Sequence, residues 1–365
     1  MSRIVLLDAQ KSLSVGFTVP LAEVLESTGR EVCLARDPRD LAAGDALLIL
    51  GLANWAELSA PFLVRARELG VRRILWNCEP LLPPDLPRSR LQDWYLHANA
   101  AGFARRPPRK QRLLDRVAYY GFTVQSWGLP WNRDWAFSGR QFSYPAKESR
   151  KVLGFWRDGL IDAIFVSLQP RQQFLSNHGI PSQFVPVGYH PFWGSLLAGG
   201  ERDIDVVFLG HASRRRRPLL RELGNTLAKA GFELKVIDGN CYGDERTRLL
   251  NRAKVLINLN SMPWESPGMR LLMAMSCKAM VVSEYAADIA PYENGKHLLM
   301  AARKDLAGLI VSCLRDEAMR SSIADRAYQF VTREHTLAKR LVAALEIDAK
   351  SIGSAMQKPR DVLES

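Results

Sequence analysis

The chain has no long apolar run, no paired cysteines and no low-complexity segment. Nowhere do roughly 18 apolar residues follow one another, the least that a membrane-spanning helix requires. The five cysteines stand singly, without a C-x-x-C pair or histidines at ligand spacing, which argues against a zinc site or a disulfide framework. We find no D-x-D carboxylate pair suited to Mg²⁺ or Mn²⁺. The sequence therefore predicts a reduced, metal-free, cytoplasmic protein.

Positive charge, by contrast, is in excess. The 365 residues carry a formal net charge of +12, and 47% of them are hydrophobic, enough apolar material for two packed domains. Nucleotide diphosphates, acidic lipid and nucleic acid are all suitable partners for such a charge. Two basic clusters stand out, at residues 105–112 and 214–217. The first contains two prolines and no apolar period, which predicts an exposed loop or a solvated face.

In the N-terminal half, short apolar runs alternate with helical patterns. This alternation is typical of β-α-β units, which form a parallel sheet covered on both faces, and we expect one such domain over residues 1–197. After the predicted strand at residues 73–76, Glu79 stands before Pro80. Ligands bind beyond the carboxyl ends of strands in such sheets. Glu79 is therefore either a working carboxylate or an ordinary turn residue.

A stretch over residues 116–144 is rich in tryptophan and tyrosine and contains Gly128, Pro130 and Gly139. The glycines and the proline predict turns, and aromatic side chains near a cleft can stack on sugar rings. Core packing is the other explanation for the tryptophans. The stretch is therefore either an acceptor-binding region or part of the core.

The second half repeats the architecture, and we expect a second domain over residues 203–335. A buried strand ends at Gly210, His211 lies in the following loop, and a helix begins after Ser213, a good N-cap. Glycine lets the backbone approach a phosphate closely, and at least one of the arginines 214–217 should point back at it. We expect the last helix, within residues 336–365, to cross back to the first domain.

The most informative segment runs from Trp264 to Cys277 and follows an apolar run at residues 255–259. A strand ends in asparagine, a Pro-Gly turn follows, and an apolar helix begins with Arg270 in its first turn. Free N–H groups of Gly268 and Met269 at the helix start would bind a phosphate, and Arg270 would add a charge-assisted contact. The alternative is a plain loop-to-helix junction with a surface arginine.

Together these features resemble the GT-B glycosyltransferases, which have an α/β fold of two Rossmann-like domains facing a cleft. The resemblance is closest to the spore-maturation-protein-like (CgeB-like) branch of the group 1 enzymes, with its phrase N-L-x…E-x-P-x-x-R-x-x-E-A-x-A-C-G-x-x-V-V-S. Residues 74–81 and 185–191 also resemble segments of that branch. The segments that match the phrase are Asn258-Leu259-Asn260, Glu265-Ser266-Pro267-Gly268-Met269-Arg270, Ala274-Met275-Ser276-Cys277 and Val281-Val282-Ser283.

The resemblance implies transfer of a sugar from a nucleotide-diphosphate-sugar donor to an acceptor in the interdomain cleft. Helix dipoles and basic side chains, rather than a metal or a cofactor, would stabilise the leaving diphosphate. The resemblance does not identify the acceptor, which could be a glycan, a lipid-linked molecule, a protein or another molecule. The positive charge of the chain is compatible with peripheral binding to an anionic membrane. Candidates for a general base are Glu79 and His190. The predicted donor-binding residues are Gly210, His211, Arg214, Arg215, Asn260, Glu265, Pro267, Gly268, Met269 and Arg270.

Two positions depart from the family phrase. Met273 stands where the family has a second glutamate that accepts hydrogen bonds from the donor ribose, which methionine does poorly. Lys278 replaces the glycine that follows the family's cysteine. A catalytically silent GT-B-fold binding protein is therefore one alternative. A nucleic-acid-directed transferase or binder is another, suggested by the charge, although no nucleic-acid motif is present.

Overall fold

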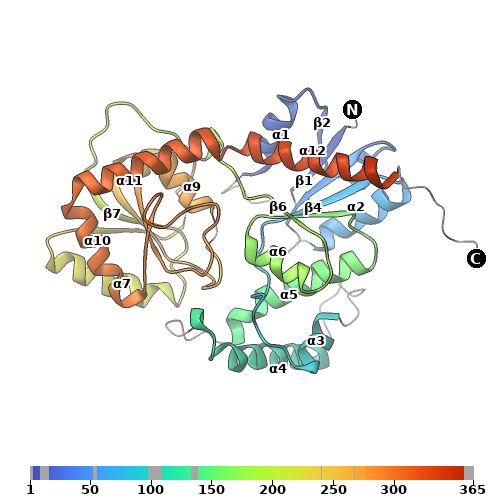
Figure 1. Cartoon of the computed structure of the whole chain (residues 1–365), viewed down its shortest axis with the longest axis horizontal. Helices are drawn as coiled ribbons and strands as arrows, with labels where there is room; N and C mark the ends of the chain where they lie inside the picture. Colours follow the sequence, from blue (N-terminus) through green and yellow to red (C-terminus); the bar gives the residue numbers. More distant parts are fainter. Residues whose placement is uncertain are drawn as a thin grey trace, which may run out of the picture.

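The computed structural model describes residues 3–8, 16–51, 56–97, 109–132, 139–239, 241–266 and 268–356. Figure 1 shows two α/β lobes side by side, with the last helix of the chain leading from one to the other. Among the described residues, no helix combines the length and the apolarity needed to cross a bilayer. Pro267 and residues 105–108 lie outside the described ranges.

The N-terminal lobe is a six-stranded parallel sheet in the order β2-β1-β3-β4-β5-β6. Helices α1 (Thr18–Glu26), α2 (Ala56–Glu68) and α6 (Gln169–Ser176) connect its strands. Strands buried on both faces have almost continuous apolar sequences, as in Ala-Leu-Leu-Ile-Leu of β3. The strands are β1 (Ile4–Asp8), β2 (Val32–Leu34), β3 (Ala46–Leu50), β4 (Arg72–Asn77), β5 (Ala163–Val166) and β6 (Gln183–Phe184).

The C-terminal lobe is a five-stranded parallel sheet in the order β11-β10-β9-β7-β8. Its strands are β7 (Ile204–Leu209), β8 (Leu234–Ile237), β9 (Ala253–Asn258), β10 (Met280–Glu284) and β11 (Leu299–Ala301). Its helices are α7 (Arg216–Lys229), α8 (Gly243–Arg252), α9 (Met269–Ser276), α10 (Leu306–Arg315) and α11 (Glu317–Gln329). The lobe's first strand, β7, lies between its second, β8, and its third, β9, so the chain changes direction across the sheet at β7/β9. Ligands of doubly wound sheets bind beyond the strand ends at such a switch point. The predicted fold of two doubly wound parallel sheets is confirmed.

The C-terminal helix α12 (Leu337–Met356) packs on the N-terminal lobe. Leu341 and Leu345 share a buried apolar cluster with Leu21 and Leu25 of α1. An ion pair of 2.6 Å between Arg72 of β4 and Asp348 of α12 adds a polar contact. The last helix therefore ties the end of the chain to the first lobe.

A loop of the C-terminal lobe, residues 261–266, inserts into the N-terminal lobe. The Trp264 ring is 2% exposed and stacks on Phe142, with the ring centroids 5.9 Å apart. The Glu265 carboxylate pairs with the Arg171 guanidinium at 2.8 Å, and both side chains are 2% exposed. The two lobes are thus joined by buried contacts as well as by the chain.

Gly128 lies in a turn and Pro130 begins a 3₁₀ turn, as predicted, whereas Gly139 begins a helix. Most of the rest of the aromatic-rich stretch that the structure describes is helical. It forms α4 (Arg109–Ser126) and α5 (Gly139–Arg157), which together with α3 (Arg90–His97) form a helical layer below the sheet in Figure 1. Phe122 and Phe142 are fully buried between these helices, because their aromatic surface gains more from core packing than from solvent. The basic cluster 105–112, expected as a loop, is helical from Arg109 onward.

Helix α7 begins at Arg216, two residues later than predicted, because Arg215 is its N-cap residue. The Ser213 hydroxyl still accepts a hydrogen bond of 3.4 Å from the Arg216 amide. This shift decides which of the four arginines points toward the strand ends.

Candidate functional site

A cavity of about 330 Å³ lies beyond the carboxyl ends of β7, β8 and β9, at the switch point of the C-terminal sheet. The strand ends contribute Leu209, Gly210 and Asn258, and the first turns of α7 and α9 contribute Arg216 and Arg270. Its lining residues are Leu209, Gly210, His211, Arg216, Gly239, Cys241, Tyr242, Arg246, Asn258, Leu259, Ser261, Met269, Arg270 and Met273.

Three arginines give this cavity its charge. Arg216 donates to the carbonyl oxygens of His211 at 3.0 Å and Leu259 at 2.7 Å. Arg270 donates to the Asn258 side-chain oxygen at 2.8 Å. Both guanidinium groups lie over the Phe208 ring, 5.9 Å and 5.5 Å from its centroid, in cation–π contact. Arg246 is 3% exposed, and its buried Nε has no hydrogen-bond partner among the described residues.

None of the three arginines forms an ion pair with a carboxylate of the described chain. Burial lowers the pKa of Arg216 to about 10, with the charge of Arg215 adding to the effect. Burial lowers the pKa of Arg270 to about 9, with a further contribution from the charge of Arg216. The pKa of Arg246 is lowered by the same desolvation. Buried cations without counter-ions are unfavourable, so the cavity favours an anionic ligand.

The helix start predicted from the sequence lies beside this cavity. Gly268 is the N-cap of α9, and its carbonyl accepts the first helical bond, from Leu272 at 2.9 Å. Met269 lines both this cavity and a smaller one of about 130 Å³ between the lobes, which Gly268 and Arg171 also line. The positive end of the α9 dipole therefore lies beside both cavities.

Gly210 and His211, two of the predicted donor-binding residues, line the cavity. Gly210 has φ 134°, and a Cβ built on it would lie 2.7 Å from Nη2 of Arg270. The exposed His211 imidazole lies 3.3 Å from the Asp238 carboxylate. The glycine therefore leaves the space that the Arg270 guanidinium fills.

Arg214, Arg215 and Asn260 lie outside the cavity lining. Arg214 is exposed, and Arg215 pairs with both oxygens of the buried Glu284 carboxylate. Asn260 donates to the Glu284 carbonyl at 3.1 Å and accepts from Ser266 at 2.9 Å. The Arg215 and Asn260 side chains therefore connect the loops beside the cavity.

Glu265 is engaged in the pair with Arg171 described above. Arg171 approaches from α6 of the other lobe and also donates to the Ser167 hydroxyl at 2.9 Å. Neither oxygen of Glu265 is directed at the cationic cavity, since Nε and Nη2 of Arg171 each bind one of them. In this structure the residue joins the lobes.

The two candidates for a general base are held by contacts within the N-terminal lobe. Glu79 accepts a hydrogen bond from the Tyr144 hydroxyl, and its amide donates to the Asn77 side chain at 2.7 Å. His190 caps a short 3₁₀ turn, and its Nε2 lies 3.3 Å from Glu23. Burial lowers the pKa of His190. Neither side chain lines the cationic cavity, the small cavity between the lobes or the larger cavity beside α6.

The two departures from the family phrase lie in different places. Met273 is 6% exposed and lines the cationic cavity. Lys278 follows the C-cap of α9 with φ 54°, a left-handed conformation that glycine adopts most easily. Its ammonium pairs with Asp325 at 2.7 Å and lies over the Tyr328 ring. The lysine thus packs on α11, and only Met273 can contact a ligand in the cavity.

Carboxylates that could bind a metal are also placed elsewhere. The chain does contain one D-x-D pair, Asp203 and Asp205, which the sequence analysis did not consider. It lies where β7 begins, at the end of the strand opposite the cavity. Its two carboxylates pair with Arg252 and Lys254. Within the described ranges, no three His, Cys, Asp or Glu side chains form a group that could bind a metal ion.

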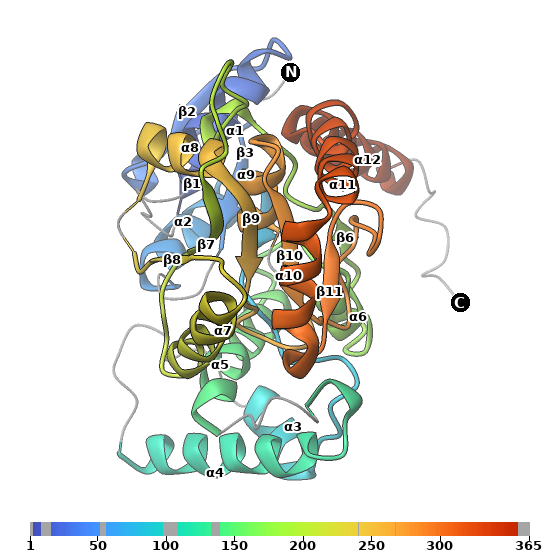
Figure 2. The same cartoon turned by 90° about the vertical axis from the view of Figure 1, so that its left-hand side faces the viewer.

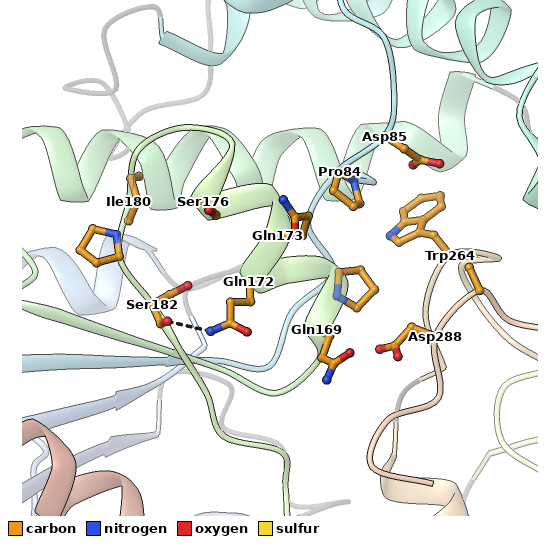
Figure 3. Close-up of a pocket in the computed structure, with 13 residues that line it drawn as sticks. Pro84, Asp85, Gln169, Gln172, Gln173, Ser176, Ile180, Ser182, Trp264 and Asp288 are labelled. Atoms are coloured by element: carbon orange, nitrogen blue, oxygen red, sulfur yellow. Dashed lines mark hydrogen bonds between the residues drawn. The ribbon is translucent and has the colours of Figure 1, made fainter. Parts of the chain in front are cut away.

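A third cavity, of about 780 Å³, opens between α6 and the C-terminal lobe. Figure 3 shows Gln169 and Gln173 of α6 on one side and Trp264 and Asp288 of the C-terminal lobe facing them. Burial raises the pKa of Asp288. The described part of the wall combines amide, hydroxyl and carboxylate groups with one aromatic ring and includes no basic residue. Such a surface suits a neutral, hydroxyl-rich ligand.

Two doubly wound lobes facing each other, with a C-terminal helix crossing back, define the GT-B fold. Residues 214–346 match the family model described as glycosyl transferase-like. Anabaena HepE, in complex with UDP and glucose, has a similar structure, with a TM-score of 0.51 at 13% identity over 97% of this chain and 100% of that one. No curated protein matches the chain.

A second structural neighbour is the N-terminal domain of Candida albicans trehalose-6-phosphate phosphatase. It has a TM-score of 0.50 at 10% identity, over 96% of this chain and 97% of that one. Identities this low establish the shared fold alone. The functional argument therefore depends on the cavities.

Proposed function

We propose that the protein is a glycosyltransferase of the spore-maturation-protein-like branch, which moves a sugar from a nucleoside-diphosphate sugar to an acceptor. The observation that carries the proposal is the cavity at the β7/β9 switch point, lined by Arg216, Arg246 and Arg270 without a carboxylate partner among the described residues. A diphosphate supplies the negative charge that these buried cations lack. The glycosyl transferase-like match over residues 214–346 and the complexes of Anabaena HepE with UDP-glucose support the same conclusion.

In this proposal the arginines stabilise the leaving group. Negative charge builds up on the diphosphate as the glycosidic bond breaks, and preorganised guanidinium groups and helix amides stabilise it at no reorganisation cost. Arg216 and Arg270 are already fixed by their hydrogen bonds, and the amides at the start of α9 are held in place by the helix that follows them. We further propose that these groups replace a metal, since the described lining residues include none of the carboxylates that Mg²⁺ prefers.

The three cavities suggest a path for the sugar. Met269 lines both the cationic cavity and the small one between the lobes. Leu168 lines the small cavity, and its neighbour Gln169 lines the large one. We propose that the donor sugar occupies the small cavity and that the acceptor enters through the large one, where hydroxyl groups find amide and carboxylate partners. The acceptor is then a saccharide or a glycosylated molecule. Since Glu79 and His190 line none of these cavities, the proposal assigns the role of general base to neither of them.

The test is a thermal-shift screen of the full chain against UDP, GDP, ADP, CMP and TDP sugars. A ligand at about 100 times its dissociation constant stabilises the folded state by roughly 2.7 kcal/mol. Arg270→Gln should abolish the shift, because it removes a charge inside the cavity. Arg214→Gln is the matched control, since that arginine is exposed outside it, and should leave the shift intact. An unchanged shift in Arg270→Gln would overturn the assignment of the donor site.

A second candidate function is nucleotide binding without transfer. Met273 favours it, because a thioether in the cavity wall is a poor acceptor of the hydrogen bonds that ribose hydroxyl groups would donate to a glutamate. It predicts a thermal shift with nucleotide but no release of sugar or transfer from any donor. Measuring nucleoside diphosphate release for the wild type and for Met273→Glu separates the two functions. Release by the wild type excludes the silent protein, and release by Met273→Glu alone supports it.

A further inference from the structure

Helix α4 carries a row of apolar side chains that face solvent. Leu113, Tyr120 and Trp127 are each 64% exposed, Val117 is 47% exposed and Val124 is 57% exposed. Their spacing of four, three, four and three residues along the sequence places them on one face of the helix and its C-terminal turn. Single exposed apolar residues are ordinary, whereas a continuous row marks an interaction surface.

The opposite face of α4 already belongs to the core. Ala118 and Phe122 are buried against the neighbouring helices, and the Tyr119 hydroxyl contacts that of Tyr95 in α3 at 3.1 Å. Figures 1 and 2 both show α4 along the outer edge of the N-terminal lobe, far from α12. The exposed row therefore lies on the side of α4 that faces away from the described core of the lobe.

The charged residues of α4 indicate what kind of partner would bind to it. Helix α4 contains Arg109, Lys110, Arg112 and Arg116 in its sequence and a single acidic residue, Asp115. Asp115 is buried, 7% exposed, whereas Arg116 is exposed. Beside the apolar row the helix therefore exposes Arg116, and both the sequence of α4 and the whole chain, with a net charge of +12, have an excess of positive charge.

We propose that α4 binds the surface of an anionic lipid bilayer, with its axis in the plane of the membrane and the row 113–127 in the interface. Helices that combine an apolar face containing Trp and Leu with basic residues lie in the membrane–water interface, and Trp and Tyr side chains are enriched there. A second copy of the chain would bring the same positive charge to the interface, which disfavours self-association through this face. The proposal does not depend on the sugar-transfer activity.

The experiment is co-sedimentation of the full chain with vesicles of phosphatidylcholine, alone or mixed with phosphatidylglycerol. The wild type should sediment with the mixed vesicles, and less so as salt is raised, because salt screens the basic residues. Val117→Gln/Val124→Gln should lower the partition coefficient at least tenfold, since burial of each valine side chain raises that coefficient by about a factor of ten or more. Arg116→Gln should lower it by about fivefold, the value expected for one basic residue at a charged surface.

The matched control is Val19→Gln/Ile347→Gln, which changes two apolar side chains, 46% and 56% exposed, on α1 and α12. It should sediment like the wild type. Light scattering in solution should give the same mass for the wild type and for Val117→Gln/Val124→Gln. Three results would overturn the proposal: no sedimentation of the wild type, equal binding to neutral vesicles, or a fall in oligomeric mass in the α4 variant.

Discussion

Gly210 affects both the backbone conformation at the cavity and the position of the Arg270 side chain. Its φ of 134° is one that side-chain-bearing residues rarely adopt, and the Arg270 guanidinium occupies the space where a Cβ would lie. A methyl group here therefore affects both the stability of the lobe and the position of a cavity arginine.

Gly210→Ala should destabilise the protein by about 1–3 kcal/mol, the cost of a strained backbone, and should also weaken nucleotide binding because Arg270 must move. Gly231→Ala is the matched control, since Gly231 has φ 85° but nothing within 4 Å of its added Cβ. Urea denaturation and titration with the nucleotide found in the screen measure the two effects. If both variants bind nucleotide equally well, the contact between residue 210 and Arg270 has no role in the site.

The sequence predicted some of the cavity residues and missed others for identifiable reasons. Gly210, Met269 and Arg270 follow strand ends, where the chain pattern is informative. Arg216 was hidden among four consecutive arginines, because only the helix start decides which one points inward. Arg246 had a usable signal, since it shares the buried face of α8 with Leu249 and Leu250.

At the scale of secondary-structure elements, alternating apolar runs predicted the strands of both sheets within a few residues, except for the three-residue edge strand β11, which was missed. The pattern failed over α4 and α5, because aromatic residues occupy several faces of each helix and glycine and proline lie between them. The contact of Glu265 with α6 could not be predicted either. Its partner Arg171 is 94 residues away along the chain, and no pattern of neighbouring residues predicts a contact across such a separation.

Arg171→Met should therefore destabilise the protein by about 3–5 kcal/mol, because Glu265 would remain charged and buried without a partner. The double variant Arg171→Met/Glu265→Met should be closer to the wild type, since both charges are removed together. Denaturant unfolding of the wild type, the single variants and the double variant forms a complete cycle. A double variant as unstable as the sum of the single ones would show that α6 and the loop at Glu265 contribute independently.

At the scale of the whole molecule, the two lobes share a strand order, and the chain returns to the first lobe beside His335. The amide of Tyr189, in the N-terminal lobe, donates to the His335 carbonyl at 2.7 Å. The imidazole is fully buried, stacks on Phe330 and accepts a hydrogen bond of 2.9 Å from Arg340 through Nδ1. A ring nitrogen that accepts this bond carries no proton, so the folded protein requires a neutral His335.

This requirement predicts how stability depends on pH. Burial, together with the charge of Arg340, lowers the pKa of His335 to about 3, whereas the unfolded chain has the usual value of about 6.5. Below pH 6.5 the unfolded state takes up a proton that the folded state does not. The stabilisation is therefore complete above that pH and is lost as pH falls toward 3, by about 1.4 kcal/mol per unit.

His335→Gln keeps a hydrogen-bond acceptor but cannot titrate in this range. The variant should be less stable than the wild type at pH 7, because its side chain packs less well between Phe330 and Tyr292. The difference should shrink by about 2–3 kcal/mol between pH 6.5 and 4.5, because only the wild type loses the histidine contribution. Urea unfolding of both proteins across this range measures it. Parallel pH profiles would mean that the junction between the lobes tolerates a protonated His335.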